Sequence, residues 1–453
     1  MLQHLHYFNS LRYLKPGNLK SKLEYVKWRN YIDKTEFLTK AELNELQWDK
    51  LKNLLAHSYN HVPYYRSLFE SIDAHPSDIK TFSDFEQIPF LTKSMLRESP
   101  EKFVSDQIKK KSFRMITTGG STGKPLGFYR QPVMDTIERA FMYHQWSRVG
   151  FNEKGSRIIL RGEPLSKNRL YQKRPYSNVW LLSSYHLSED HISEYVEILN
   201  KIQPDFFHVY PSSLFLFTQL LVSCPLKLNF KPKAVLCGSE PVFDFQRKLF
   251  EEVYDTRVYS WLGQAEGAVL AGECEHSNHY HVWPQHSYVE LIDENGIPIH
   301  QKGRSGEIVG TTINNFGAPF IRYKTGDIGT YHNDHCPHCG RNYMILNKID
   351  GREQDKILLE DGRVVPLTAI TFGLHFNAYR KVNKMQIMQK IPGVIHIYIH
   401  TLHSVEFTSD DEDEIRTKMM NAVGGKLKIN FVYTDDLKRT KSGKHIYFIQ
   451  ELQ

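Results

Sequence analysis

Short apolar segments alternate with amphipathic segments over the middle of the 453-residue chain, and this alternation constrains the fold more than any other feature. Segments typical of strands and of helices follow one another from about residue 112 to residue 265: FRMITT, PVMDTIERAFMYHQWSRVG, SRIILRG, HISEYVEILNKI, DFFHVY, PSSLFLFTQLLVSC, KAVLCG, FDFQRKLFEEVY and RVYSWLG. Such alternation predicts an α/β core with a largely parallel sheet, whose strand ends present loops to a ligand.

The segments on either side of this core show different patterns. Residues 1–100 predict a helical lead-in, because AELNELQWDKLKNLLAHSYNHV carries apolar residues at three- and four-residue spacings. Strand-like stretches split by turn signals predict an antiparallel β subdomain over residues 276–350, and residues 353–453 predict a small α+β domain. The predicted fold class is therefore α/β and multidomain, with a large N-terminal domain of residues 1–352 whose α/β core covers residues 101–275.

Composition restricts the class of protein. The chain is 40% hydrophobic and 13% aromatic, which suffices for a large core, and it has no apolar run of 18 residues that would predict a transmembrane segment. The N-terminus lacks the compact apolar stretch of a signal peptide, so we expect a cytoplasmic protein. The net charge of +7 is modest and the basic residues are dispersed, which argues against a nucleic-acid partner. A weak peripheral contact with an anionic membrane is compatible with the basic N-terminus, and the oligomeric state stays open, a homodimer included.

A glycine- and hydroxyl-rich loop, TTGGSTGKP at residues 117–125, follows a predicted strand. Its glycines let the backbone approach a ligand closely, while its hydroxyls, N–H groups and lysine can contact phosphate oxygens. The candidate contacts are Thr118, Gly120, Ser121, Thr122, Gly123 and Lys124. Thr118 and Pro125 stand where a P-loop needs a glycine and a hydroxyl, so the loop is predicted to bind phosphate without being a P-loop. The alternative is a mobile loop between two strands.

Eight motifs occur in a fixed order along the chain. They are NHVPYYRSLF (60–69), IPFLTKSMLRE (88–98), TTGGSTGKP (117–125), CGSEPV (237–242), WLGQAEG (261–267), RYKTGD (322–327), GREQDK (351–356) and RTKSGK (439–444). In this order they resemble the adenylate-forming ligase superfamily, and within it the phenylacetate-CoA ligase branch that includes CapK-like polysaccharide-biosynthesis proteins. The resemblance implies a large N-terminal adenylation domain and a mobile C-terminal lid.

The resemblance also implies a role for several residues in binding ATP. Ser121, Thr122 and Lys124 would hold the β- and γ-phosphates, and Gly238, Ser239 and Glu240 would line the adenine pocket. Gly263 and Gln264 belong to the motif in which Glu266 would hold Mg²⁺, a cation that prefers oxygen ligands. Asp327 would accept hydrogen bonds from the ribose hydroxyls, and Arg352 would assist beside it. Lys444 would stabilise the charge that builds up as the carboxylate attacks the α-phosphate.

A second group of residues predicts a metal site. Cys336 and Cys339 have C-x-x-C spacing, and ECEHSNHYHV supplies Cys274 together with His276, His279 and His281. We expect a structural Zn²⁺ held by Cys274, Cys336, Cys339 and His281, with His276 as the second choice for the histidine. The alternative is a set of reduced thiols in turns.

The implied reaction converts a carboxylic acid and Mg·ATP into an acyl-adenylate and pyrophosphate, and then transfers the acyl group to CoA or to an amine or hydroxyl acceptor such as an amino sugar. The resemblance places this reaction in polysaccharide biosynthesis. We expect the aromatic-rich segments between residues 205 and 265, including Phe206, His208 and Tyr210, to line the acyl pocket.

Two departures from the motif keep another class of function open. Leu262 and Ala265 replace an aromatic ring and a hydroxyl that relatives carry, so a catalytically inactive nucleotide-binding scaffold is the alternative. Trp261 and Tyr259 are candidate substitutes for the missing ring. A zinc-dependent nucleic-acid binder is less favoured, because it would need a basic face with interleaved aromatic residues.

Overall fold

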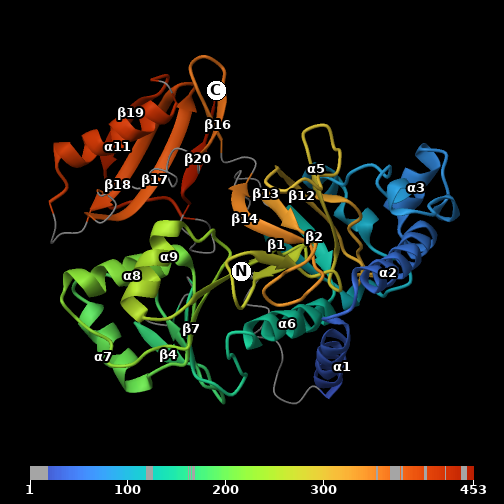
Figure 1. The fold of residues 1–453 in the computed structure, drawn as a ribbon, viewed down its shortest axis with the longest axis horizontal. Coiled ribbons are helices and arrows are strands. Elements are labelled where there is room, and N and C mark those ends of the chain that lie inside the picture. The colour runs from blue at the N-terminus through green and yellow to red at the C-terminus, as the bar shows by residue number, and fades with distance from the viewer. Residues whose placement is uncertain are drawn as a thin grey trace. The chain divides into compact units, whose positions relative to one another are not determined.

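The computed structural model describes residues 19–118, 126–161, 163, 165, 169–352, 356–367, 378, 381–401, 406–423, 425–439 and 446–452. These residues form two compact units (Figure 1). The first unit contains residues 19–118, 126–149 and 261–350, and the second contains residues 150–260 and the described residues from 351 onward. The mixture of helices with a many-stranded sheet confirms the predicted α/β class. The predicted domain boundaries stay predictions.

Helices make up the N-terminal part of the first unit. They are α1 (Leu19–Thr35), α2 (Lys40–His61), α3 (Pro63–Ser71), α4 (Phe82–Phe85), α5 (Lys93–Glu98) and α6 (Pro132–Ser147), with short 3₁₀ turns at Pro76–Asp78, Pro100–Phe103 and Lys110–Ser112. Helix α2 begins where the sequence predicts it, because Thr39 and Glu42 form a capping box: Thr39 Oγ1 accepts from the Glu42 N–H (3.3 Å) and Glu42 Oε2 accepts from the Thr39 N–H (2.8 Å).

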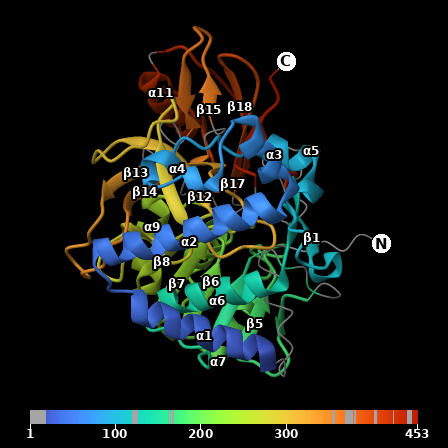
Figure 2. The same cartoon turned by 90° about the vertical axis from the view of Figure 1, so that its right-hand side faces the viewer.

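Helix α1 lies within the predicted helical lead-in, before the segment whose apolar spacing indicates a helix. It lies along α6 (Figure 2), where the hydroxyl oxygens of Ser21 and Thr136 are 3.1 Å apart and the rings of Tyr25 and Tyr143 meet edge to face. Its sequence, LKSKLEYVKWRNYIDKT, is mostly polar. The helix is therefore held by its packing on α6 rather than by a strong apolar stripe of its own.

The strands of the first unit are mainly antiparallel. Strands β1 (Arg114–Thr118) and β2 (Leu126–Arg130) form a separate hairpin, with Thr118 opposite Leu126. The sheet of this unit has the order β11 (Tyr288–Ile292), β12 (Ser305–Thr311), β13 (Tyr323–Asn333), β14 (Ile345–Arg352), β10 (Tyr280–Val282), β9 (Leu270–Glu273) and the end of β8 (Val258–Gly263). One hydrophobic core lies between these strands and helices α2 and α3, and it includes Leu54, Tyr65, Phe69, Ile308 and Tyr323.

The second unit contains the predicted parallel sheet. Its strands lie in the order β4 (Tyr171–Lys173), β5 (Val179–Leu182), β3 (Arg157–Leu160), β6 (Phe206–Val209), β7 (Ala234–Gly238) and the first residues of β8. The pairs β3/β5, β3/β6 and β6/β7 are parallel, while β4 and β5 pair antiparallel. Helices α7 (Ile192–Ile202), α8 (Pro211–Ser223) and α9 (Asp244–Tyr254), green in Figure 1, share one core with β3, β6 and β7. The sequence predicted β3, β6 and β7 but not β4 and β5.

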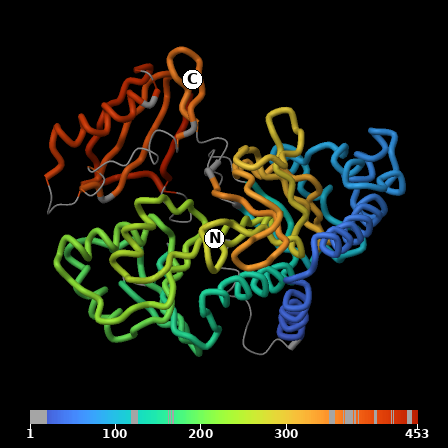
Figure 3. Tube along the Cα trace, viewed as in Figure 1, coloured from blue at the N-terminus to red at the C-terminus, as the bar shows by residue number. Residues whose placement is uncertain are grey.

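The C-terminal part of the second unit has its own sheet and core. The sheet order is β19 (Lys428–Tyr433), β18 (Val394–Thr401), β17 (Val382–Ile391) and β20 (Phe448–Gln450), and helix α11 (Ser409–Ala422) packs on it. The two longest strands of this sheet, β17 and β18, run side by side as red tubes in Figure 3. A small hairpin, β15 (Lys356–Leu358) with β16 (Val364–Pro366), completes this part.

Among the described residues, no helix is both long and apolar enough to cross a membrane.

The β17–β18 turn generates a stability prediction. Gly393 has a φ of +73°, and a Cβ atom there would lie 2.9 Å from the Glu360 backbone nitrogen. Gly425 has a φ of +78° with open space around it. We expect Gly393→Ala to lower the unfolding free energy by about 1–3 kcal/mol more than Gly425→Ala, because only the first adds a clash to the backbone strain. Differential scanning calorimetry of both variants measures this difference, and equal losses would contradict it.

Candidate functional site

The predicted phosphate loop connects the two strands of a hairpin. Strand β1 ends at Thr118 and its partner β2 begins at Leu126, and these two residues are paired. The loop residues Gly120, Ser121, Thr122, Gly123 and Lys124 lie outside the described residues, as does Lys444. The side chains of Thr118 and Arg352, at the ends of β1 and β14, are likewise outside the described part. Their predicted roles stay predictions.

Three other predicted residues of the nucleotide site come together in the first unit. Gln264 Nε2 donates a hydrogen bond to Asp327 Oδ2, and Tyr323 Oη donates to Glu266 Oε1 at 2.9 Å. Glu266 and Gln264 follow β8, whereas Tyr323 and Asp327 belong to β13. Gln264, Glu266 and Asp327 are half-buried, so their polar groups border solvent. Two motifs some 60 residues apart thus contact each other twice, through Gln264 with Asp327 and through Glu266 with Tyr323.

The turn that carries Asp327 has a fixed geometry. Gly326 has a φ of +75° and its N–H donates to Glu307 Oε1 (3.0 Å), while the Asp327 N–H donates to Thr325 Oγ1 (3.0 Å). Lys93, from the IPFLTKSMLRE motif, donates to the Thr325 carbonyl. Glu307 of β12 and Lys93 of the IPFLTKSMLRE motif therefore both hold the backbone next to Asp327, where the register of β13 is irregular.

Arg130 is a site residue that the sequence did not reveal. It lies at the end of β2 and is buried, and its Nη1 donates to the carbonyl of Ala265 at 2.8 Å. Its other nitrogens contact Asp135 (3.1 Å) and Glu138 (2.6 Å) on α6. Arg130 therefore fixes the turn that presents Glu266, and a buried arginine at the end of a short strand gives no sign of this role in the sequence.

The residues that depart from the family motif take part in packing. Ala265 is buried, and Leu262 packs against the main core of the first unit. Trp261 is buried with its ring edge against Trp146, and Tyr259 is also buried, so neither ring presents a face to solvent. Neither can replace the missing aromatic ring without rearrangement.

The predicted adenine-pocket residues lie in the second unit, after β7. Ser239 has a φ of +68°, a left-handed conformation that is strained for a residue with a side chain, and its Oγ accepts from Arg161 Nη2 at 2.7 Å. Glu240 accepts from the N–H (3.0 Å) and Oγ (3.1 Å) of Ser212, in the first turn of α8. The carboxylate therefore stabilises the N-terminus of α8. The role of Gly238, Ser239 and Glu240 toward adenine stays a prediction.

The four predicted metal ligands lie together. The ligand atoms of Cys274, His281, Cys336 and Cys339 all fall within 4.8 Å of one another, and this is the group that the described residues offer for a metal ion. Cys274 Sγ is 3.9 Å from Cys336 Sγ, and Cys339 Sγ is 3.9 Å from His281 Nε2. A tetrahedral zinc with its usual bond lengths separates its ligand atoms by about 3.5–3.8 Å, so the cluster fits such an ion.

Local structure explains how these ligands meet. Cys274 directly follows β9 and His281 lies in β10, which pairs antiparallel with β9. Cys336 and Cys339 share a tight turn in which the Gly340 N–H donates to the Cys336 carbonyl (2.9 Å). His276 contributes its backbone N–H to Cys274 Sγ (3.4 Å), so the geometry favours His281 as the fourth ligand. Burial lowers the pKa of His281 and so favours the neutral imidazole that binds a metal.

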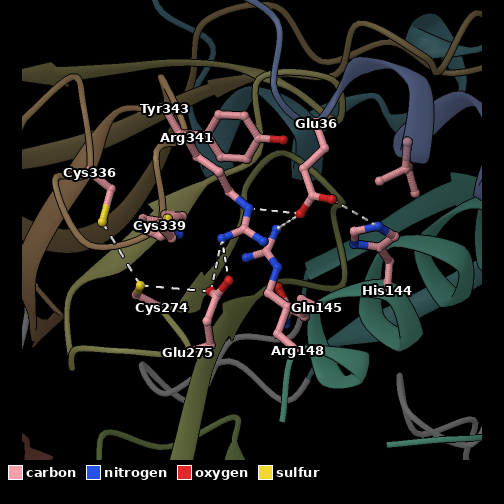
Figure 4. A network of polar contacts seen from close by, with 12 residues as sticks. Glu36, His144, Gln145, Arg148, Cys274, Glu275, Cys336, Cys339, Arg341 and Tyr343 are labelled. Atoms are coloured by element: carbon pink, nitrogen blue, oxygen red, sulfur yellow. Dashed lines mark hydrogen bonds and ion pairs between the residues drawn. The ribbon is translucent and has the colours of Figure 1, made fainter. Parts of the chain in front are cut away.

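A network of buried charges adjoins the cysteine cluster (Figure 4). Arg341, two residues after Cys339, places Nε 2.8 Å from Glu36 and Nη1 2.7 Å from Glu275. Glu36 also binds Arg148 Nη2 (3.0 Å) and His144 Nε2 (3.3 Å). Burial alone would raise the pKa of Glu36, but the hydrogen bond from His144 and the charges of Arg148, His144 and Arg341 lower it to about 2. The network thus joins the end of α1 to α6 and to the metal cluster.

Known proteins are similar to this chain in sequence and in fold. Residues 361–451 match the model of the CapK C-terminal domain. A phenylacetate-coenzyme A ligase of Aromatoleum evansii is 25% identical over 347 residues, covering 74% of this chain and 76% of the relative. Protein CapK of Staphylococcus aureus is 20% identical over 462 residues, covering 98% of this chain and 97% of the relative. The predicted resemblance to this branch is confirmed.

A solved structure of another ligase has a similar fold. A 2-hydroxyisobutyryl-CoA ligase, solved in the postadenylation state in complex with R3-HIB-AMP, has a TM-score of 0.72 and 19% sequence identity, and the match covers 92% of this chain and 91% of that one. These relatives and this neighbour agree with the predicted class, an adenylate-forming ligase.

The cysteine cluster predicts that the purified protein contains a bound metal ion. We expect the purified protein to hold one zinc ion per chain, and Cys274→Ser or Cys336→Ser to lose it, because two thiolates and an imidazole bind zinc much more weakly than a complete set. Cys224→Ser is the matched control, since Cys224 is a half-buried cysteine outside the cluster. Inductively coupled plasma mass spectrometry measures the metal, and Co²⁺ substitution reports a tetrahedral thiolate site by its absorption. Full metal content in Cys336→Ser would contradict the assignment.

Glu36 predicts a pH dependence of stability. Its pKa is about 2 in the folded chain and near 4.5 when unfolded, so its contribution is complete above pH 4.5 and is lost as the pH falls toward 2. We expect Glu36→Gln to destabilise the protein at pH 7 by roughly 3–5 kcal/mol, because the buried Arg148 and Arg341 lose a partner. Its stability should also fall less steeply between pH 5 and 3. Thermal unfolding over this range tests both effects, with Glu24→Gln as control, because the half-buried Glu24 of α1 pairs only with Lys27 among the ion pairs of the described residues. Equal behaviour of the two variants would refute them.

Proposed function

We propose that this protein is an AMP-forming ligase that joins a carboxylic acid to ATP as an acyl-adenylate and then transfers the acyl group to a second acceptor. The observation that carries the proposal is that two motifs of the family contact each other, with Gln264 donating to Asp327 and Tyr323 donating to Glu266, all but Tyr323 half-buried. The two relatives described above, a phenylacetate-coenzyme A ligase and protein CapK, support the same reaction class.

The proposed roles follow from the chemistry of each side chain. Asp327 is an acceptor-only carboxylate in a fixed turn, which suits the binding of two ribose hydroxyls. Glu266, which accepts a hydrogen bond from the Tyr323 hydroxyl, would offer a carboxylate oxygen to Mg²⁺, and this ion would supply positive charge against the phosphates. The loop of Ser121, Thr122 and Lys124 would hold the β- and γ-phosphates from the tip of the β1–β2 hairpin.

The first step needs no general base, because an ionised carboxylate is already a nucleophile. Its oxygen attacks the α-phosphorus, a new C–O–P linkage forms, and the bond to pyrophosphate breaks. Lys444 would stabilise the negative charge that builds on the α-phosphate during this step. A rotation of the C-terminal domain near Arg352 would then withdraw Lys444 and admit the acceptor.

For the second step, CoA and an amine or hydroxyl group are the candidate acceptors. A role in building a surface polysaccharide, with an amino sugar as acceptor, is proposed from the resemblance of the sequence motifs to CapK-like polysaccharide-biosynthesis proteins. The matched phenylacetate-coenzyme A ligase supports CoA. A structural Zn²⁺ at the Cys₃His cluster would hold the antiparallel strands in place and take no part in the reaction, because four protein ligands leave no open position.

Exchange of labelled pyrophosphate into ATP tests the first step whatever the final acceptor is. We expect exchange that depends on a carboxylic acid, and a loss on the order of 100- to 1,000-fold in Lys444→Ala, because a fixed cation at the reacting phosphate is removed. Lys441→Ala, in the same RTKSGK motif, is the matched control and should keep the activity. Exchange with no acid in a broad panel, together with measurable ATP binding, would favour the non-catalytic scaffold instead.

A further inference from the structure

Exposed apolar side chains gather along helix α1 and just after it. Leu23 is 61% exposed and Val26 is 52% exposed, and Phe37, which follows the helix closely, is 59% exposed. The guanidinium of Arg341 lies against one side of the Phe37 ring (5.0 Å), and the residue stays exposed beside it. Single exposed apolar residues are common on proteins, but a group of them on one segment indicates an interaction surface. We call these three residues the exposed stripe.

Helical spacing gives α1 two apolar faces. Leu23 and Val26 are three residues apart and so lie on one face of the helix. The other face carries Tyr25, Trp28 and Ile32: the rings of Tyr25 and Trp28 contact aromatic rings of α6, and Ile32 is fully buried. Packing on α6 therefore accounts for one apolar face of α1 and leaves the face with the exposed stripe uncovered by the described residues.

Lysines flank the exposed stripe on both sides. Successive residues of an α-helix are turned by about 100°, so that Lys20, Lys27 and Lys34, seven residues apart, follow one side of the Leu23–Val26 line. Lys22 lies on the other side of this line by the same geometry. All four lysines are exposed. The uncovered face of α1 is thus apolar along its centre and cationic along its borders.

The acidic residues of α1 do not balance these lysines. Glu24 lies 3.7 Å from Lys27, and Asp33 lies 3.0 Å from His144 on α6. The helix has five basic residues against these two acidic ones, a net charge of +3; the basic residues are Lys20, Lys22, Lys27, Arg29 and Lys34. Glu36, the next acidic residue, is buried in its contacts with Arg148 and Arg341.

The sequence before α1 adds to this positive charge. Residues 1–18 contain Arg12 and Lys15 and no aspartate or glutamate. Residues 1–35 therefore carry seven basic and two acidic residues, which is a net charge of +5 out of the +7 of the whole chain. The positive charge that the rest of the chain leaves unbalanced is small, so the excess is concentrated at the exposed face of α1 and the segment that leads into it.

A membrane that contains anionic lipids is the partner that fits this face. A helix with apolar side chains along one face and lysines beside them lies in the lipid–water interface, with the apolar side chains in the acyl region. The lysine stems are long enough to keep the ammonium groups at the level of the phosphates. A second copy of the chain would instead bring two cationic faces together, which like-charge repulsion disfavours.

We propose that the exposed stripe and its flanking lysines dock the protein on a membrane surface rich in anionic phospholipids, with α1 parallel to the membrane plane. The proposal goes beyond the proposed ligase function and does not depend on it. Because few apolar side chains enter the lipid, the contact is reversible and needs the negative charge of the membrane in addition.

Co-sedimentation of the full chain with lipid vesicles tests this proposal. Vesicles of phosphatidylcholine alone are compared with vesicles of phosphatidylcholine and phosphatidylglycerol. We expect the partition coefficient at low salt to be on the order of 10-fold or more higher on the anionic vesicles, and to fall as sodium chloride is added, because salt screens the lysines. Equal partition to both kinds of vesicle, or no binding to either, would overturn the proposal.

A pair of lysine variants tests the location of the charge. We expect Lys20→Gln/Lys34→Gln to lower the partition to anionic vesicles on the order of 10-fold, because two ammonium groups are lost at the membrane surface. The matched control is Lys201→Gln/Lys227→Gln, which removes two exposed lysines of the second unit and changes the net charge equally. This control should keep the binding, and equal losses in the two double variants would show a non-specific effect of net charge and overturn the proposal.

A pair of apolar variants tests the exposed stripe itself. We expect Leu23→Gln/Val26→Gln to lower the partition to anionic vesicles on the order of 10-fold while the midpoint of thermal unfolding stays unchanged, because both side chains are exposed in the folded chain. Val222→Gln/Ile297→Gln, at two similarly exposed positions elsewhere, is the control and should bind as the wild type does. Full binding by Leu23→Gln/Val26→Gln would overturn the proposal. A dimer seen by analytical ultracentrifugation that this variant dissociates would assign the stripe to a second copy and overturn it as well.

Discussion

The burial of guanidinium groups is the constraint on which much of this structure depends. A cation removed from water must be paired or hydrogen-bonded, so each buried arginine fixes the segments that supply its partners. Arg322 lies between Glu290 and the carbonyl of Ile88, and in this way the RYKTGD motif is tied to β11 and to the IPFLTKSMLRE motif. Arg130 does the same for the turn before Glu266, and Arg341 for the cysteine cluster. The site residues themselves are half-buried and rest on these fixed points.

Much of the fold could be predicted from local pattern. The apolar segments FRMITT, SRIILRG, DFFHVY and KAVLCG form β1, β3, β6 and β7, and the helix expected from the apolar spacing of AELNELQWDKLKNLLAHSYNHV is α2. The metal cluster could be predicted because the C-x-x-C spacing places two thiols close together. The preference for His281 over His276 is confirmed, because the ring of His281 belongs to the cluster. The contact between the motifs WLGQAEG and RYKTGD could be expected from the family resemblance, whereas no spacing within this chain predicts it.

The remaining features of the structure depend on contacts between residues that are far apart in the sequence. Helix α1 is held by α6, more than 100 residues away, and its mostly polar sequence gives no strong period. Arg161 meets His208 and Ser239 only when β3, β6 and β7 are placed in parallel register, since these contacts lie 47 and 78 residues further on. The expectation that Phe206 lines the acyl pocket stays a prediction; in the structure Phe206 is the first residue of β6 and packs against Phe151.

The Cys₃His cluster joins points that are far apart along the chain, with Cys274 and Cys336 separated by 62 residues. Closing a loop of that length in the unfolded chain costs conformational entropy. A metal ion bound by Cys274 and Cys336 would act as a cross-link between them that forms when the chain folds. Strands β10, β11, β12 and β13 of the first unit's sheet lie within this loop. Metal supply is therefore expected to govern how much mature protein accumulates rather than how fast each molecule turns over, so that cells short of zinc would show less of the protein and not a slower one.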